Sequence, residues 1–164
     1  MEISVVKGDL FESNAAIIFN AVNCEGVMGI GIAHEFKKRY PEMFELYRLA
    51  CVSGIVSPGN SFNYLVEDEN DVHQVIVNFP TKVLWRNNSR LEYIESGMQD
   101  FCKRLENGFY DKFVNGNYTI AIPALGCGYG GLNWTDVLDI LVNDLLDVET
   151  EIDWNITIYE PGSN

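Results

Sequence analysis

The sequence has few of the residues that mark metal, redox or disulfide-rich proteins. It contains only two histidines, and its four cysteines stand far apart at positions 24, 51, 102 and 127, with no C-x-x-C pair. This pattern supports neither a zinc site nor a disulfide framework, so we expect reduced thiols and no cofactor or metal. Neither Cys24 nor Cys127 has a histidine nearby in the sequence, which gives a cysteine nucleophile little support.

Long apolar runs and a secretory leader are also missing. No run approaches the roughly 20 residues that cross a membrane, and the amino terminus, MEISVVKGDLFES, lacks a basic segment followed by an apolar one. We therefore expect a cytoplasmic protein without a membrane partner. A length of 164 residues suits one domain over residues 1–164 with a proper hydrophobic core, and we expect a monomer.

Positive charge is scarce. Eleven basic residues stand against 24 acidic ones, giving a net charge of −13, and every Lys and Arg lies at or before Lys112. A long nucleic-acid track needs widely spread positive charge, so the composition excludes one. Lys82, Arg86 and Arg90 do form a local basic run at four-residue steps. Spacing alone favours a solvated face, although contact with one or two phosphates stays open.

The sequence has no GK[ST], and the first of its two glycine-rich segments does not have the GxGxxG spacing. The two segments, NAVNCEGVMGIGIA and IPALGCGYGGLNW, each run from an expected strand to an expected helix. Glycine lets the backbone approach a ligand, and the amides of a helix amino terminus suit phosphate. Tight turns would explain either segment alone, whereas two in equivalent places favour a nucleotide-like ligand.

The apolar pattern predicts alternating strands and helices. Strands are expected at 3–6, 15–21, 61–66, 72–78, 118–123 and 154–159, with an acidic turn at 67–71. Helices are expected at 32–40, 41–51, 91–105 and 134–148, and Ser89 with Glu92 is expected to cap the third in a capping box. This alternation predicts an α/β domain with helices on both faces of a mostly parallel sheet, and ligands at the carboxyl ends of its strands.

Several segments, taken in order, resemble the macrodomain family. They are KGDLFES, NAVNCEGVMGIGIAHEFKKRYPEMF, NFPTK followed by WR and SRLEYIE, IPALGCGYGGLNW, and ITIYEP. Within the family the chain is similar to the branch that contains the DarG antitoxin macrodomain and the terminal ADP-ribose glycohydrolase. The resemblance covers almost the whole chain. It implies a three-layer α/β/α sandwich with a mixed, mostly parallel central sheet, and an ADP-ribose cleft over that sheet.

The resemblance also implies which residues contact ADP-ribose. Asp9 matches the residue that takes the adenine amino group, with Leu10 beside it, and Tyr159 matches an aromatic at the same end. A turn acid and a core tyrosine would look the same in the sequence. Asn23 matches the contact to the distal ribose, whereas Asn20 is structural. The two phosphate loops are implied to be Met28, Gly29, Ile30, Gly31 and Ile32 on one side, and Gly126, Cys127, Gly128, Tyr129 and Gly130 on the other.

Lys82 matches the catalytic lysine of DarG-like enzymes, although its own neighbours in the sequence favour a solvated loop residue. As a nucleophile the amine must lose its proton, which desolvation or a cation such as Arg86 promotes. As a charged group it would instead stabilise the departing base. In the terminal ADP-ribose glycohydrolase an aspartate of the second loop assists the lysine. Gly130 stands at that position here, which favours the DarG-like branch.

The expected function is that of an ADP-ribosyl glycohydrolase that removes ADP-ribose from a modified macromolecule. The expected substrate is single-stranded DNA that carries ADP-ribose on a base, with Trp85 either stacked on a base or used in packing. Three alternatives stay open: a non-catalytic ADP-ribose reader, a phosphatase acting on ADP-ribose 1″-phosphate, and glycines that serve packing only.

Overall fold

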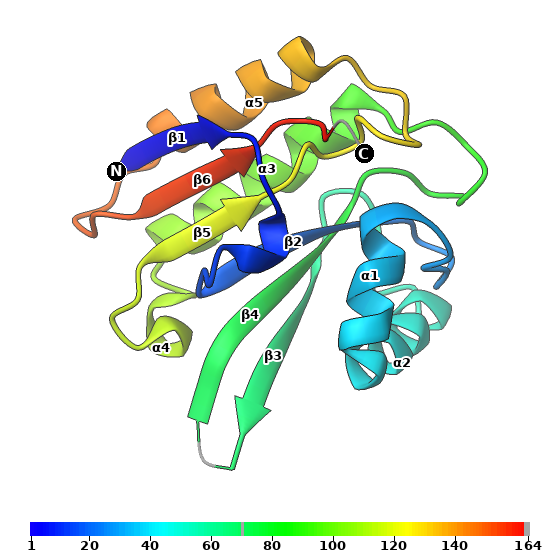
Figure 1. The fold of residues 1–164 in the computed structure, drawn as a ribbon, viewed down its shortest axis with the longest axis horizontal. Coiled ribbons are helices and arrows are strands. Elements are labelled where there is room, and N and C mark those ends of the chain that lie inside the picture. Colours follow the sequence, from blue (N-terminus) through cyan, green and yellow to red (C-terminus); the bar gives the residue numbers. More distant parts are fainter. Residues whose placement is uncertain (70, 163–164) are drawn as a thin grey trace.

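One six-stranded sheet forms the centre of the computed structural model, which describes residues 1–69 and 71–162 (Figure 1). The strand order is β1-β6-β5-β2-β4-β3, and neighbours are parallel except for β4 and β3. The strands are β1 (Glu2–Val6), β2 (Ile17–Val22), β3 (Phe62–Asp68), β4 (Asp71–Pro80), β5 (Thr119–Ile122) and β6 (Asn155–Tyr159). The predicted mixed, mostly parallel sheet is confirmed. Asn70, inside the expected acidic turn, lies outside the described residues.

Helices cover both faces of this sheet, α3 and α5 on one face and α1 and α2 on the other (Figure 1). The helices are η1 (Leu10–Glu12, a 3-10 turn), α1 (Gly31–Arg39), α2 (Pro41–Val52), α3 (Leu91–Glu106), α4 (Asp111–Val114) and α5 (Trp134–Leu146). In the described part of the chain, none of them combines the length and apolar character needed to cross a bilayer.

The hydrophobic core is divided in two by the sheet, because successive side chains of a strand point to opposite faces. On β2, Ile17 and Phe19 pack with α3 and α5, whereas Ile18 between them packs with α1 and α2. On β4, Val77 and Ile76 divide in the same way. Strands buried on both faces read as continuous apolar runs, as AAIIFNA does. The predicted three-layer sandwich is therefore confirmed.

α3 lies unusually close to β4 because Gly97 faces the sheet. A Cβ atom on Gly97 would overlap the Cζ atom of Phe79 and lie 2.5 Å from its Cε2 atom. Phe79 is fully buried and stacks on Phe19, with ring centroids 5.8 Å apart. Only a residue without a side chain fits between this helix and this ring.

The start of α3 corrects one prediction. Arg90 is the N-cap residue and its side chain makes no capping hydrogen bond. The Ser89 hydroxyl instead donates to Oγ1 of Thr81 at 3.1 Å, and Glu92 forms an ion pair with Arg90 at 3.1 Å. The predicted capping box is wrong because a tertiary partner takes the serine hydroxyl.

Candidate active site at the strand tips

The carboxyl ends of the parallel strands open into a cleft of about 1580 Å³, lined by the loops that follow β1, β2, β4, β5 and β6. Segments from the whole length of the chain meet there. Of the residues predicted from sequence, the following line the cleft: Asp9, Leu10, Asn23, Gly29, Ile30, Gly31, Ile32, Lys82, Gly126, Cys127, Gly128, Tyr129, Gly130 and Tyr159. The position agrees with the rule that α/β sheets bind ligands at strand tips.

Met28 is the predicted site residue that the structure places elsewhere. Its side chain is buried in the core between the sheet and helices α1 and α2, and its Sδ atom lies 3.8 Å from Nδ2 of Asn20. Asn20 is itself fully buried and donates to Oδ1 of Asn78 at 3.0 Å. The prediction for Met28 is therefore corrected: its side chain supports the first glycine loop from below and does not face the cleft.

Asp9 and Tyr159 lie together at one end of the cleft. The Oδ1 atom of Asp9 accepts from the Phe11 N–H at 2.9 Å and caps η1, so Asp9 is a turn acid. The carboxylate is nevertheless exposed and has a second oxygen able to accept a hydrogen bond. Burial, with a smaller contribution from the charge of Asp9, raises the pKa of Tyr159 and keeps its phenol protonated. This end combines an acceptor with an aromatic surface, which suits an adenine ring.

Asn23 holds the first glycine loop in shape. Its Nδ2 atom donates to the Val27 carbonyl oxygen at 2.8 Å, and its Oδ1 atom accepts from the Glu25 N–H at 3.0 Å and the Tyr47 hydroxyl at 3.0 Å. The side chain is largely buried but lines the cleft. A primary amide has two hydrogens on nitrogen, so one remains for a ligand hydroxyl.

The first glycine loop presents free backbone amides to the cleft. α1 begins at Gly31 with Ile30 as its N-cap, and no side chain caps it. In the part of the chain that the structure describes, the N–H groups of Gly29, Ile30 and Gly31 donate no hydrogen bond. Unpaired amides at a helix amino terminus form an anion site, strengthened by the helix dipole.

The second glycine loop also has a row of free backbone amides, but these lie before the start of its helix. Here the helix start is occupied, because the Asn133 side chain accepts from the Asp136 N–H at 3.2 Å. The free amides lie earlier in the loop, where among the described residues the N–H groups of Gly128, Tyr129 and Gly130 donate no hydrogen bond. The two loops thus share the predicted strand–turn–helix order but differ in which amides remain free.

The two loops face each other across the cleft. A Cβ atom on Gly31 would lie 3.5 Å from Cδ2 of Tyr129, so the tyrosine ring rests against the first loop. The ring is 71% exposed and otherwise unpacked. Two rows of amides on either side of one channel suit a ligand with two linked phosphates.

Gly130 leaves no room for a side chain. A Cβ atom there would overlap Oγ of Ser89 and lie 2.5 Å from the Gly126 carbonyl oxygen. Ser89 also holds this loop through its backbone, since its N–H donates to the Gly130 carbonyl oxygen at 2.9 Å. The close contact with Ser89 therefore leaves no space for the larger acidic side chain that the sequence comparison considered at this position.

Lys82 follows β4 by two residues and reaches into the same cleft. Its Nζ atom donates to the Trp85 carbonyl oxygen at 3.3 Å. Partial burial lowers the pKa of the Lys82 amine, which is the effect that a nucleophilic lysine needs. Of the two causes that the sequence suggested, desolvation lowers the pKa of Lys82, and the charge of Arg86 is not among the causes.

The lysine loop is tied to the first glycine loop. The Cys24 N–H donates to the Val83 carbonyl oxygen at 2.9 Å, and the Trp85 N–H donates to Oε2 of Glu25 at 3.1 Å. Two hydrogen bonds therefore connect the loop that carries Lys82 to the first glycine loop and its free amides.

The thiols near the cleft are poor nucleophiles. Burial raises the pKa of Cys127, which lines the cleft, to about 11. Burial together with the charge of Cys51 also raises the pKa of Cys24 to about 11. Because the thiolate is the reactive form, both groups are mostly unreactive near neutral pH.

The cleft is also lined by residues that the sequence did not single out as ligand contacts, among them Phe11, Arg39, Thr81 and Ser89. The Arg39 guanidinium lies 4.2 Å from the ring centroid of Phe11, at the end of the cleft near Asp9. Thr81 and Ser89 are both buried and form a hydroxyl pair next to Lys82. The NFPTK motif, which singled out Lys82, could also have directed attention to the adjacent Thr81, but nothing in the sequence marks Arg39.

A mixed, mostly parallel sheet between helix layers, with a cleft and two rows of free amides at its strand tips, defines a three-layer α/β/α domain. The chain belongs to the Macro domain family, whose model matches residues 19–141. This confirms the resemblance that the sequence motifs indicated.

Relatives place the chain more narrowly within that family. It is 39% identical over 160 residues to the DNA ADP-ribosyl glycohydrolase of Mycobacterium tuberculosis, covering 98% of this chain and 42% of the relative. The macrodomain of Mycobacterium tuberculosis DarG superposes with a TM-score of 0.85 at 39% identity, covering 98% of each chain. Thermosipho africanus DarTG in complex with ADP-ribose superposes with a TM-score of 0.82 at 31% identity, covering 98% of this chain and 42% of that one. The chain thus spans less than half the length of the curated relative.

Proposed function

We propose that this chain binds ADP-ribose in the cleft and hydrolyses the bond between the distal ribose and a base of single-stranded DNA. The observation that carries the proposal is the convergence of two rows of free amides and one partly desolvated lysine in a single cleft. The activity named for the Mycobacterium tuberculosis relative and the ADP-ribose named in the Thermosipho complex support it.

In the proposed complex, each end of the cleft has its own part of the ligand. Asp9 and Tyr159 take the adenine, the amides of the two glycine loops take the diphosphate, and Asn23 takes a hydroxyl of the distal ribose. The anomeric carbon then faces Lys82. A binding mode that uses neutral amides suits a protein with a net charge of −13.

The reaction breaks the bond from the anomeric carbon to the base nitrogen. Water supplies a hydroxyl to the sugar and a proton to the base, so no other reactant is needed. The lowered pKa of Lys82 favours its neutral amine, which acts at the anomeric carbon or at the aldehyde of the opened sugar. The charged alternative would stabilise the departing base instead.

The test is release of ADP-ribose from two substrates, an ADP-ribosylated single-stranded oligonucleotide and an ADP-ribosylated protein, followed by chromatography. We expect release from the oligonucleotide and loss of release in Lys82→Met. Calorimetry with ADP-ribose should give the same affinity for both forms within a fewfold. Binding without release in the unmodified protein would establish a reader instead.

A phosphatase reading has less support from the cleft. Neither His34 nor His73 lines it, so a histidine is not placed to accept a phosphoryl group. Release of phosphate from ADP-ribose 1″-phosphate, with no release from the oligonucleotide, would overturn the proposed activity.

A further inference from the structure

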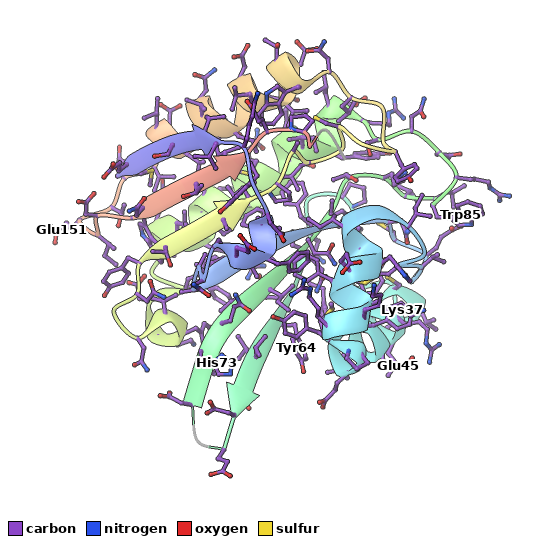
Figure 2. The ribbon with its side chains drawn as sticks, in the orientation of Figure 1. Lys37, Glu45, Tyr64, His73, Trp85 and Glu151 are labelled. Atoms are coloured by element: carbon purple, nitrogen blue, oxygen red, sulfur yellow. The ribbon has the colours of Figure 1, made fainter. Side chains whose placement is uncertain are left out.

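Trp85 is an exposed aromatic residue at the edge of the cleft. Its side chain is 52% exposed, although the residue lines the cleft beside Lys82. Figure 2 shows it at the rim of the molecule, on the loop between β4 and α3. An indole is large and apolar, so leaving half of it in water forgoes a substantial gain from burial. Packing against the protein therefore accounts for only part of this residue.

The backbone of Trp85 is held by hydrogen bonds although about half of the residue is exposed. Its N–H donates to Oε2 of Glu25 at 3.1 Å, and its carbonyl oxygen accepts from Nζ of Lys82 at 3.3 Å. The Val83 carbonyl oxygen on the same loop accepts from the Cys24 N–H at 2.9 Å. A rigid backbone that displays an exposed ring loses little conformational entropy when a flat partner stacks on it.

The charge around Trp85 is suited to a single phosphate. Arg86 is exposed, and among the described residues no carboxylate lies within 4.0 Å of its guanidinium. Arg90, the next cation along the loop, is paired with Glu92 at 3.1 Å. An aromatic surface beside an unpaired cation is the usual combination for one nucleotide of a single strand, with the base on the ring and the phosphate on the cation.

We propose that Trp85 stacks on the unpaired base next to the ADP-ribosylated one, with Arg86 contacting the phosphate between them. This inference rests on the proposed function and names the part of the substrate beyond ADP-ribose that the site reads. Because Nζ of Lys82 donates to the Trp85 carbonyl oxygen, the stacking residue lies next to the reacting amine. A base paired in a duplex has both faces covered, so the site selects a single strand.

The experiment compares two ADP-ribosylated trinucleotides that differ only in their flanking positions. One carries natural bases beside the modified base, and the other carries abasic sugars with the same phosphates. We expect kcat/KM to be roughly tenfold higher with the natural bases, in line with the usual contribution of one stacked base. Trp85→Ala should remove this ratio, whereas Trp85→Phe should retain part of it.

Charge variants separate stacking from electrostatic attraction. Arg86→Ala should lower kcat/KM by a similar factor for both trinucleotides, leaving their ratio unchanged. Lys103→Ala removes one exposed positive charge from α3 and is the matched control, expected to change neither value. Equal kcat/KM for the two trinucleotides with the unmodified protein, or a ratio that survives Trp85→Ala, would overturn the inference.

Failure of the inference can be told apart from failure of the proposed function. If the unmodified protein releases ADP-ribose equally from both trinucleotides, the function stands and the stacking does not. If it releases none, the proposed activity fails, and fluorescence anisotropy with the same trinucleotides and variants still tests stacking through affinity. In that case a tenfold affinity ratio that Trp85→Ala removes supports it, and equal affinities reject it.

Discussion

Among single residues, Lys82 has the property that the proposed chemistry needs most. Its amine is partly desolvated and is held by a neutral carbonyl oxygen rather than by a carboxylate. A carboxylate partner would raise the pKa, whereas desolvation lowers it. The structure thus provides an amine that loses its proton more readily than an ordinary lysine does.

The first prediction concerns pH. Because the pKa of Lys82 is lowered, the neutral amine accumulates below the ordinary lysine value of about 10.4, so the rate of ADP-ribose release should rise with pH and level off before that value. Lys82→Met and Lys82→Arg should each lose at least about 100-fold in kcat. Single-turnover release between pH 6 and pH 10 measures both effects.

Whether the rate of release rises or falls with pH decides between a nucleophilic and an electrostatic role of the Lys82 amine. A rate that falls across the same range would show that the charged form is active, which is the electrostatic alternative. Lys82→Arg keeps a positive charge at every accessible pH, so substantial activity in this variant would also contradict a nucleophilic amine.

The second prediction concerns Gly130. Gly130→Ala should destabilise the fold by about 1–3 kcal/mol, because the new Cβ atom meets the Gly126 carbonyl oxygen at 2.5 Å and the loop must move. ADP-ribose affinity should fall in parallel, since the displaced amides are those that face the ligand. Urea unfolding and calorimetry measure the two quantities.

A matched control lies two residues away in the same loop. A Cβ atom on Gly128 would have nothing within 4 Å, so Gly128→Ala should change the free energy of unfolding by no more than about 0.5 kcal/mol. Equal stability losses for the two variants would mean that general loop stiffness, and not the Ser89 and Gly126 contacts, sets the requirement at position 130.

The location of the site residues was predictable where a motif fixed it, and less so where the orientation of a side chain mattered. The two glycine loops, Asp9 and Lys82 all reach one cleft, as expected from the order of the motifs. The Met28 side chain does not line the cleft, and this was missed because a sequence does not show to which side of an irregular loop a side chain points. The hydroxyl pair of Thr81 and Ser89 was missed for a similar reason: it forms only when β4 and α3 are in place.

At the scale of secondary structure, the packing of α3 on β4 depends on one missing side chain. We predict that Gly97→Ala destabilises the protein by about 1–3 kcal/mol, because its Cβ atom cannot avoid the buried ring of Phe79. Helix propensity alone would predict that Gly97→Ala stabilises the protein, since alanine is the better helix former. Thermal and urea unfolding check the direction.

An exposed position of the same helix provides the control. Gln99 faces solvent on α3, so Gln99→Ala should change the stability by no more than about 0.5 kcal/mol. A stabilised Gly97→Ala variant would show that the Phe79 ring moves at little cost and that the close contact is not required.

The longer elements were predictable to within a few residues, because their apolar patterns are regular. Two short elements, η1 and α4, gave no periodic pattern and were not predicted. The order of strands in the sheet was also beyond prediction, since the pattern shows which residues are buried but not which strand lies next. The prediction of a capping box at Ser89 was wrong because a sequence pattern over four residues does not include a distant partner such as Thr81.

At the scale of the whole molecule, charge limits how the protein could bind the proposed DNA substrate. A net charge of −13 disfavours contact with a long phosphate backbone, whereas Lys82 in the cleft and the nearby exposed Arg86 offer local positive charge. Affinity for a modified strand must therefore come mainly from ADP-ribose and the nearest nucleotide.

This leads to a prediction on salt. Binding of an ADP-ribosylated single strand to Lys82→Met should weaken by only about tenfold between 50 and 200 mM salt, corresponding to about two phosphate contacts on the strand. Unmodified strands of the same length should bind too weakly to measure at micromolar protein. Fluorescence anisotropy provides both values. A slope steeper than about −5 in a plot of log K against log salt would contradict a small footprint.

The two hydrogen bonds that join the lysine loop to the first glycine loop carry a consequence for engineering. Grafting the NFPTKVLWR segment alone onto another macrodomain scaffold would leave the amine without the Cys24 amide and the Glu25 carboxylate that hold its loop in register. A chimera should gain the proposed activity only when both segments are transplanted together, so the transferable unit of this site is a pair of loops and not a residue.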